Sequence, residues 1–319
     1  MIGLAKVQIG EKLNFEVRDG VSLEGNLLKP KGNGPYPLVV FVMGSGGETY
    51  KIDWEHENFY LCRTIASVCV ANGFAFLLVE KRGVEGSGGT WMKQTFEGRA
   101  DDIYDVIQSM KTREDIISDK ISVAGQSQGG WIVQLLAAKY PNEITSALST
   151  AGPVYSVIEQ IVDSQTLMWT GKNVNPILIG IGGKLLTCIF NIYKKFSSLK
   201  RMGYLSYIID YDARTIVPEI KTPIFMIFAE NDISVPLEKN EPLARKMLSN
   251  VQVPYQIRII PKTNHGFALS EKFQSWSEIK SAPAPAFIET LNEFCTWTKS
   301  LTNQYVDCSI SDELFVKKG

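Results

Sequence analysis

Three residues spread along the 319-residue chain have the types and the order that nucleophilic catalysis requires. Ser127 stands at the centre of the pattern GQSQG, between a strand-like run and a helical one. A serine hydroxyl needs a base, and the base needs a group that fixes its tautomer. Asp232, in FAENDISVP, and His265, in PKTNHGFAL, follow the serine at the ends of two later strand-like runs. This order predicts a nucleophile, an orienting acid and a base.

Few other residues compete for these roles. The chain has two histidines, and the other one, His56, precedes the serine. It lies among acidic residues, which indicates a loop or the rim of a substrate site. Glu230 still lies at the end of its predicted strand, whereas Asp232 lies in the loop beyond it. With so few histidines and no C-x-x-C pair, we predict no metal. The glycine clusters match neither nucleotide-binding pattern, so no cofactor is predicted.

The oxyanion that forms during acyl transfer needs backbone N–H donors. Gln128, directly after the serine, would supply one of them at the beginning of a helix, where the dipole favours negative charge. The glycine-rich loop GSGGE, after a predicted strand at residues 38–44, would supply the other. We assign that donor to Ser45, with its neighbour Gly46 as the alternative. A loop that serves only for turning stays open as a third interpretation.

The elements that must position these residues alternate along the chain. Residues 12–30 alternate apolar and polar side chains about Asp19-Gly20, which predicts an antiparallel hairpin. Buried strands and helices then follow one another, as in a parallel sheet that is covered on both faces. The predicted strands are residues 38–44, 74–80, 120–125, 143–150, 222–230 and 253–261, and the predicted helices are residues 58–73, 98–113, 128–140, 236–250 and 285–301.

Residues 153–218 interrupt this alternation and are too long for an ordinary connection. Their apolar helical runs predict an inserted helical cap, whose side chains would be buried above Ser127 and enclose the substrate. Packing at the sheet edge or a homodimer contact is the alternative. The predicted fold class is therefore α/β, a doubly wound, mainly parallel sheet with an N-terminal β-hairpin and an inserted helical cap. Residues 1–152 and 219–301 would form its core, and residues 302–319 a C-terminal extension.

The composition argues against several classes of partner. The chain has 45% hydrophobic and 21% charged residues, a net charge of −1 and no long basic run, so no nucleic-acid surface is predicted. Its first residues lack the pattern of a secretory signal, and scattered cysteines indicate reduced thiols, so we expect a cytoplasmic protein. Glycines and Lys184 interrupt the apolar residues 175–193, so no stable membrane insertion is predicted.

Over roughly residues 13–301 the sequence resembles the α/β-hydrolase superfamily. KRGVEGSGG after a strand, DDIYDVIQSMK before the serine, and AENDISVP with NHGF after it are similar to the serine esterase and prolyl-oligopeptidase-like branch. The resemblance implies a serine hydrolase that needs no cofactor and works through an acyl-enzyme. One departure is Met43-Gly44, which stands where many relatives have His-Gly.

These observations together favour a hydrolase of carboxylic esters or thioesters that acts on a small-molecule acyl ester. Ser127 would attack the acyl carbon, His265 would transfer the proton and Asp232 would orient His265. A serine peptidase or amidase of the prolyl-oligopeptidase-like type is the first alternative. Such peptidases usually carry an N-terminal propeller, which the sequence does not contain, so we expect the ester hydrolase. A non-catalytic ligand-binding relative is the second alternative.

Overall fold

The structure is a computed structural model that describes residues 9–56, 58–196 and 203–314. The first residues of the chain, from which we expected no secretory signal, lie largely outside the described residues. The same holds for residues 197–202 of the predicted cap and residues 315–319 of the predicted extension.

An eight-stranded sheet forms the centre of the protein, in the order β1-β2-β4-β3-β5-β6-β7-β8. β1 and β2 form the antiparallel hairpin, β2 pairs antiparallel with β4, and all the other neighbours are parallel. The predicted fold class, a mainly parallel α/β sheet with an N-terminal hairpin, is confirmed. The strands are Glu11–Glu16 (β1), Ser22–Leu28 (β2), Tyr36–Val42 (β3), Ala75–Val79 (β4), Ile116–Gln126 (β5), Ala147–Thr150 (β6), Ile224–Ala229 (β7) and Tyr255–Ile260 (β8).

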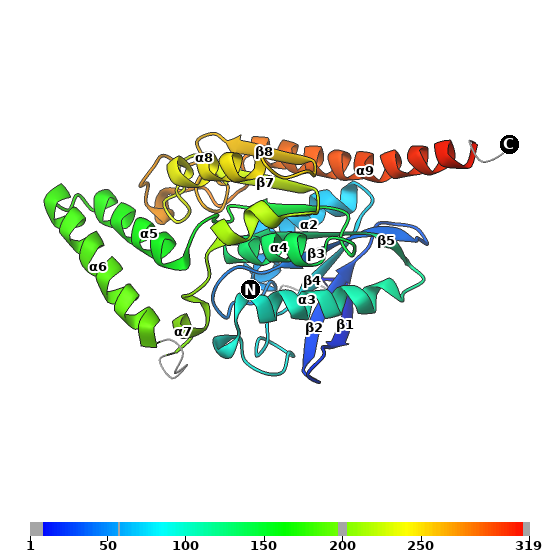
Figure 1. The fold of residues 1–319 in the computed structure, drawn as a ribbon, viewed down its shortest axis with the longest axis horizontal. Coiled ribbons are helices and arrows are strands. Elements are labelled where there is room, and N and C mark those ends of the chain that lie inside the picture. The colour runs from blue at the N-terminus through cyan, green and yellow to red at the C-terminus, as the bar shows by residue number, and fades with distance from the viewer. Residues whose placement is uncertain (1–8, 57, 197–202, 315–319) are drawn as a thin grey trace, which may run out of the picture.

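Helices cover both faces of this sheet (Figure 1). α2 and α9 share one apolar core with the sheet, and α3, α4 and α8 share the other. Every residue of β4, β6 and β7 is buried, which explains their continuous apolar sequences. The helices are Ile52–Glu55 (α1), Leu61–Ala71 (α2), Phe96–Lys111 (α3), Gln128–Lys139 (α4), Val157–Gly171 (α5), Pro176–Phe196 (α6), Leu205–Ile208 (α7), Leu237–Leu248 (α8) and Pro285–Leu314 (α9).

Two element boundaries differ from the predicted ones. β5 begins at Ile116 rather than at Lys120, because its polar first half lies near the surface and lacks the apolar run of its second half. α9 continues past Leu301 to Leu314, into the segment that we predicted as an extension. A helical backbone satisfies its own hydrogen bonds, so it can continue where the apolar pattern that marked it in the sequence fades.

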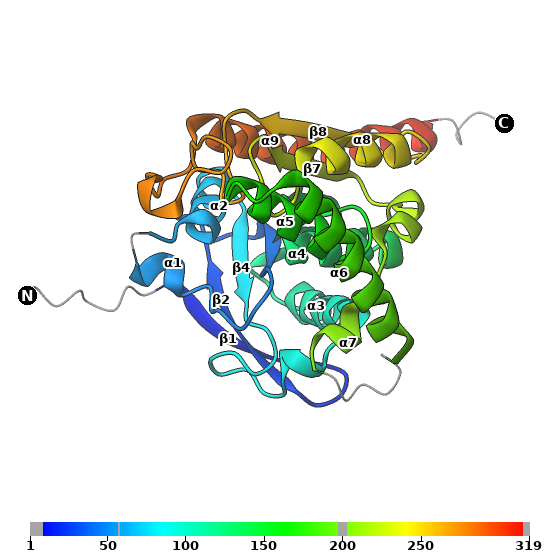
Figure 2. The same ribbon diagram turned by 90° about the vertical axis from the view of Figure 1, so that its left-hand side faces the viewer.

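Among the described residues between β6 and β7 are three α-helices, α5, α6 and α7, followed by two short 3-10 helices. Where this segment begins and ends, its two chain ends lie side by side. Ser156 and Asp212 form an isolated antiparallel bridge, and the Val157 N–H donates to the Tyr211 carbonyl at 3.2 Å. Figure 2 shows α5 and α6 in front of α3 and α4, at the edge where the parallel strands end.

The expectation that the apolar side chains of this segment are buried is wrong for α6. Among its residues only Gly183 is buried. α6 packs through one face on α5, where a side chain at Gly182 would collide with the ring of Trp169 and one at Gly183 would meet Thr166. Because α6 touches the rest of the protein mainly through α5, its opposite face stays exposed to solvent. Whether the segment encloses a substrate stays a prediction.

Candidate active site

Ser127 lies at the sharp turn between β5 and α4, in a backbone conformation that serine rarely adopts. Its φ is 55° and its ψ −121°, which is a strained combination for a residue with a side chain. Added Cβ atoms at Gly125 and Gly129 would collide with the carbonyl oxygens of Gly129 and Val42. The Ser127 N–H donates to the Thr150 carbonyl at 3.0 Å, which fastens the turn to β6. The two glycines of GQSQG are therefore required for this turn, which holds the serine at the carboxyl edge of the sheet.

His265 and Asp232 come together in the loops after β8 and β7. His265 Nδ1 lies 2.7 Å from Asp232 Oδ2, and the Asp232 side chain is 1% exposed. The other carboxylate oxygen accepts from the Ser234 and Val235 N–H groups at 2.7 and 2.8 Å. These bonds fix the carboxylate, which in turn fixes the ring with Nδ1 protonated and leaves Nε2 as an acceptor.

The pKa of His265 reflects two opposing effects. Burial of the imidazole lowers its pKa, whereas the charge of Asp232 and its hydrogen bond raise it. The two contributions of Asp232 together prevail, so the pKa lies above the ordinary value of 6.5. A histidine of this kind can change its protonation state near neutral pH, as a general base must.

Gln126, which the sequence reasoning missed, is hydrogen-bonded to Nε2 of this histidine. Its side-chain Nε2 lies 3.1 Å from His265 Nε2 and 3.5 Å from the His265 carbonyl oxygen. With Nδ1 protonated, the amide N–H donates to the ring. In the part of the chain that the structure describes, no hydrogen bond joins Ser127 Oγ to His265. The serine hydroxyl would have to take the place of this amide to transfer its proton.

The two alternatives to the predicted base and acid lie differently. His56 is exposed in the loop after α1, with its ring centroid 6.4 Å from that of Phe59. Glu230 accepts from the Lys262 N–H at 2.7 Å, so it joins the ends of β7 and β8. Neither residue has a described hydrogen bond to His265. Their positions fit the sequence interpretation of a loop histidine and a strand-end acid.

The glycine-rich loop after β3 passes close to the serine. A Cβ atom at Gly44 would lie 3.7 Å from Ser127 Cβ and 3.3 Å from the Gln126 carbonyl oxygen. Ser45 follows Gly44 directly, and Gln128 is the first residue of α4 on the other side of Ser127. Their backbone N–H groups stay the predicted oxyanion donors.

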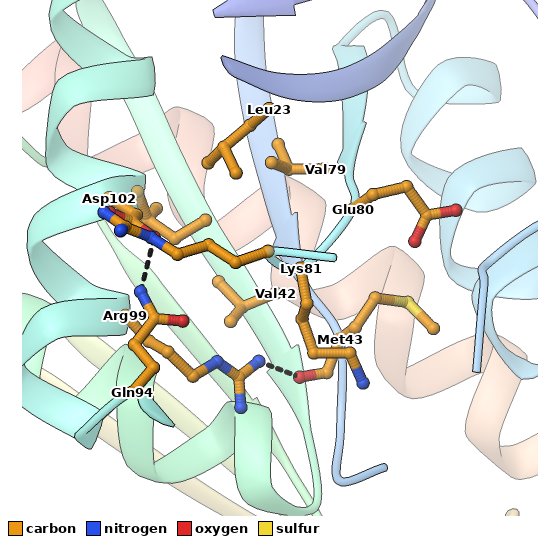
Figure 3. A pocket seen from close by; sticks show the side chains of 11 residues that line it. Leu23, Val42, Met43, Val79, Glu80, Lys81, Gln94, Arg99 and Asp102 are labelled. Atoms are coloured by element: carbon orange, nitrogen blue, oxygen red, sulfur yellow. Dashed lines mark hydrogen bonds and ion pairs between the residues drawn. The ribbon is translucent and has the colours of Figure 1, made fainter. Parts of the chain in front are cut away.

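Two buried basic side chains, Arg99 and Lys81, support this loop and the beginning of α4 (Figure 3). The Arg99 guanidinium donates to the Met43 carbonyl at 2.8 Å and to Gln128 Oε1 at 2.8 Å. Lys81 Nζ donates to the carbonyls of Gly44 and Ser45 at 3.2 and 3.4 Å, and also to that of Gly46. Burial, together with the nearby charge of Arg99, lowers the pKa of Lys81 to about 7. Sequence reasoning missed both residues, although charges directly after the buried strand β4 were a usable signal.

We expect the Lys81→Met variant to lower kcat roughly tenfold to a hundredfold with little change in KM. The substitution leaves three loop carbonyls without their donor, so the loop loses its fixed position. Complete removal of an oxyanion donor costs about 10²–10³ in kcat, and a displaced donor should cost less. Ester turnover and a thermal melt measure the effect. Lys246→Met, an exposed position on α8, is the control, and an unchanged kcat in Lys81→Met would show that the loop needs no such support.

A metal centre has no counterpart in this region. Among the described residues, no group of three or more His, Cys, Asp or Glu side chains is arranged to hold a metal ion. The arrangement instead joins a strained serine, a histidine on a buried carboxylate, and a loop whose carbonyls face cations.

Two family models match successive parts of the chain. The model of the X-Pro dipeptidyl-peptidases (S15 family) matches residues 19–174, which include Ser127. The model of the dienelactone hydrolase family matches residues 211–298, which include Asp232 and His265. Helix α6 lies between the two matched ranges.

Curated relatives include the human acylamino-acid-releasing enzyme, which is 25% identical over 263 residues. That match covers 79% of this chain and 32% of the relative, so the chain spans about a third of its length. The human carboxymethylenebutenolidase homolog is 35% identical over 81 residues, which cover 25% of this chain and 32% of that protein.

Solved structures share the fold over most of the chain. The structure described as a DcsB complex with its substrate analogue superposes with a TM-score of 0.62 at 15% identity and covers 91% of this chain and 98% of that one. Est1E from Butyrivibrio proteoclasticus has a TM-score of 0.55 at 16% identity and covers 91% and 99% of the two chains. The sheet topology, the two family models and these structures together define the class: the chain has the α/β-hydrolase fold. The matched families and relatives are hydrolases of the esterase and peptidase types.

Proposed function

We propose that the protein is a serine hydrolase that cleaves carboxylic esters or thioesters through an acyl-enzyme intermediate. The observation that carries the proposal is the pairing of a strained serine turn with a histidine that bonds a buried aspartate 2.7 Å away. Strain at Ser127 has a purpose when its hydroxyl must project toward a substrate. A purely structural turn would explain neither the buried Asp232 carboxylate nor the ring bound to it.

In the proposed mechanism the Ser127 oxygen attacks the acyl carbon while its proton moves to His265 Nε2. The imidazolium then gives this proton to the leaving alcohol or thiol as the bond to the acyl carbon breaks. Water, deprotonated by the same nitrogen, attacks the acyl-enzyme, and the imidazolium returns this proton to the Ser127 oxygen as the acid leaves. Asp232 stabilises the imidazolium in both halves of the reaction, and the N–H groups of Ser45 and Gln128 bind the oxyanion.

A peptidase or amidase of the acyl-peptide type is the second candidate. The match of the S15 family model over Ser127 favours it, as does the acylamino-acid-releasing enzyme, which aligns with 79% of this chain. The dienelactone hydrolase match over Asp232 and His265 favours ester cleavage. An ester is the easier substrate, because its leaving group needs less help from a protonated base than an amine does.

Two assays test this proposal. A fluorophosphonate probe should label the protein at Ser127, because only an activated serine reacts with it. A series of p-nitrophenyl esters with acyl chains of increasing length, run beside acyl-amino-acid p-nitroanilides, separates the two candidates. We expect turnover of the esters to exceed that of the anilides. The opposite ranking would favour the peptidase, and a folded protein without any labelling would support a non-catalytic ligand-binding relative.

The pH dependence of this activity should follow His265. Only the neutral imidazole accepts the serine proton, so kcat/KM should rise as the pH passes upward through the pKa of His265 and fall below it. Since Asp232 holds that pKa above its ordinary value of 6.5, the midpoint should lie above 6.5 as well. Initial rates on a neutral ester, measured between pH 5 and 9, check this. A midpoint well below 6.5 would contradict the assigned pairing.

A further inference from the structure

Helix α6 presents a continuous apolar strip to solvent. Seven of its large apolar side chains are about half exposed or more, and apart from the adjacent Ile177 and Leu178 they recur every three or four residues along the helix. At 3.6 residues per turn they fall within an arc of about 120°. They are Ile177 (72%), Leu178 (59%), Ile181 (59%), Leu185 (58%), Ile189 (48%), Ile192 (53%) and Phe196 (53%). We call these seven residues the α6 strip.

The α6 strip faces away from the rest of the protein. The opposite face of the helix packs on α5, where Gly182 lies against Trp169 and Gly183 against Thr166. Figure 1 shows α6 as the outermost helix at the left end of the molecule. Among the described residues, α6 is the one helix long and apolar enough to cross a membrane, with a mean hydropathy of 1.5 and 6% of its most apolar part buried. Monomeric proteins rarely leave such a large apolar surface in water.

The charged residues of α6, and of the sequence directly before and after it, have one sign. The sequence between Gly171 and Gly203 contains no Asp or Glu, although the whole chain has a net charge of −1. Lys184 and Lys195 are exposed and fall at the edge of the strip by helical spacing. Lys194 lies 3.5 Å from Asp210, which follows α7. The complete set of basic residues in this stretch is Lys172, Lys184, Lys194, Lys195, Lys200 and Arg201.

We propose that the α6 strip docks on the surface of a membrane that contains anionic lipids. An apolar strip edged by lysines suits the interface, where apolar side chains enter the acyl boundary and ammonium groups bind negative headgroups. A second copy of the chain fits less well. Two α6 helices packed through the same strip would bring lysines toward lysines, and the stretch offers no carboxylate to pair with them.

The helix would lie in the interface rather than span the bilayer. Lys184 stands near the middle of α6, so a spanning helix would place its charge near the bilayer centre. Both ends of α6 also return to the protein. On one side, the Gln160 side chain of α5 donates to the Ser234 carbonyl, next to the Asp232 loop. On the other, the Tyr204 hydroxyl donates to Gln128 Oε1 at 2.9 Å. This inference does not depend on the proposed activity.

An environment-sensitive fluorophore on Cys188 tests the docking directly. Cys188 is exposed on α6, whereas Cys62, Cys69 and Cys295 are buried, and Cys308→Ser removes the fifth thiol of the sequence. The NBD-labelled protein is mixed with vesicles of phosphatidylcholine alone or with 30% phosphatidylserine. We expect a blue shift and stronger emission with the anionic vesicles. Spin-labelled lipids should quench this emission, and 0.5 M NaCl should weaken the binding.

Paired variants and matched controls distinguish binding through the α6 strip from non-specific binding to vesicles. Vesicle co-sedimentation of the unlabelled protein should fall at least tenfold for Ile181→Ser with Leu185→Ser. It should also fall for Lys184→Glu with Lys195→Glu, but on anionic vesicles only. Ile259→Ser, at an exposed apolar position on β8, is the control for the first pair. Lys221→Glu with Lys246→Glu, at exposed positions outside α6, is the control for the second.

Each outcome decides the proposal. Anionic-vesicle binding that both pairs abolish and both controls keep supports it, with far-UV circular dichroism to show that the variants are folded. The charge pair keeps the test valid if the serine pair does not fold. No vesicle binding by the parent protein overturns the proposal. Two results together would also overturn it, because they would assign the strip to a second copy of the chain. One is a blue shift that depends on protein concentration without vesicles. The other is a dimer in sedimentation velocity that Ile181→Ser and Leu185→Ser dissociate.

Discussion

Ser127→Ala is expected to lower ester turnover by about 10³ or more while the fold is kept. The substitution removes one small hydroxyl and no hydrogen bond that the structure describes. It also removes the hydroxyl oxygen that would attack the acyl carbon. The residual activity would come from binding of the substrate and from the oxyanion donors. Turnover of the preferred p-nitrophenyl ester, beside a thermal melt, measures both consequences.

The same variant has a second readout. Fluorophosphonate labelling should disappear, whereas the affinity for a slowly hydrolysed ester should change little, because the serine contributes to attack and hardly to ground-state binding. Replacement of a neighbouring hydroxyl, in Ser149→Ala, is the control, since Ser149 lies on β6 and its side chain is buried. A folded Ser127→Ala protein that keeps half of its activity would remove this turn from consideration as the reaction centre.

His265→Gln should lower kcat nearly as much as Ser127→Ala does, by a factor on the order of 10³ or more. Glutamine can keep a hydrogen bond to Asp232, but it cannot accept a proton and return it at neutral pH. The dependence of rate on a group with a pKa above 6.5 should vanish together with the activity. Single-turnover measurements with the fluorophosphonate would show slow labelling of a serine that is still present.

His56→Gln is the matched control for the base. Its side chain is exposed in the loop after α1, so the substitution should leave kcat within a small factor and at most alter KM. Reversed severities of the two histidine variants would overturn the assignment of His265.

The sequence was sufficient to predict the sheet because each strand carried a local signal. Asp19-Gly20 predicted the hairpin turn, and apolar runs such as those of β3 and β7 predicted strands that are buried on both faces. The proximity of Asp232 and His265 followed from topology alone: parallel neighbours end at the same edge, and β7 and β8 are such neighbours.

Contacts between distant segments could not be predicted in this way. Lys81 supports the glycine-rich loop after β3 only because β4 and β3 are neighbours, and Arg99 reaches Met43 only because α3 packs beside β3. Gln126 pairs with a residue that lies 139 positions away. The exposure of α6 was missed for a different reason. An apolar sequence predicts that a surface will be covered, but not whether this chain or something outside it provides the cover.

The Ser156–Asp212 bridge, which joins the two ends of the segment between β6 and β7, has a consequence for how such proteins diversify. The segment begins and ends at the Ser156–Asp212 bridge, so its backbone leaves and rejoins the rest of the protein at one place. A unit whose ends already touch adds little loop-closure entropy when it grows, since each doubling of loop length costs only about 0.6 kcal/mol. Recombination can therefore replace the helices between Ser156 and Asp212 while β6 and β7 keep their pairing. The proposed reaction and the proposed membrane docking thus belong to parts of the chain that can be inherited separately.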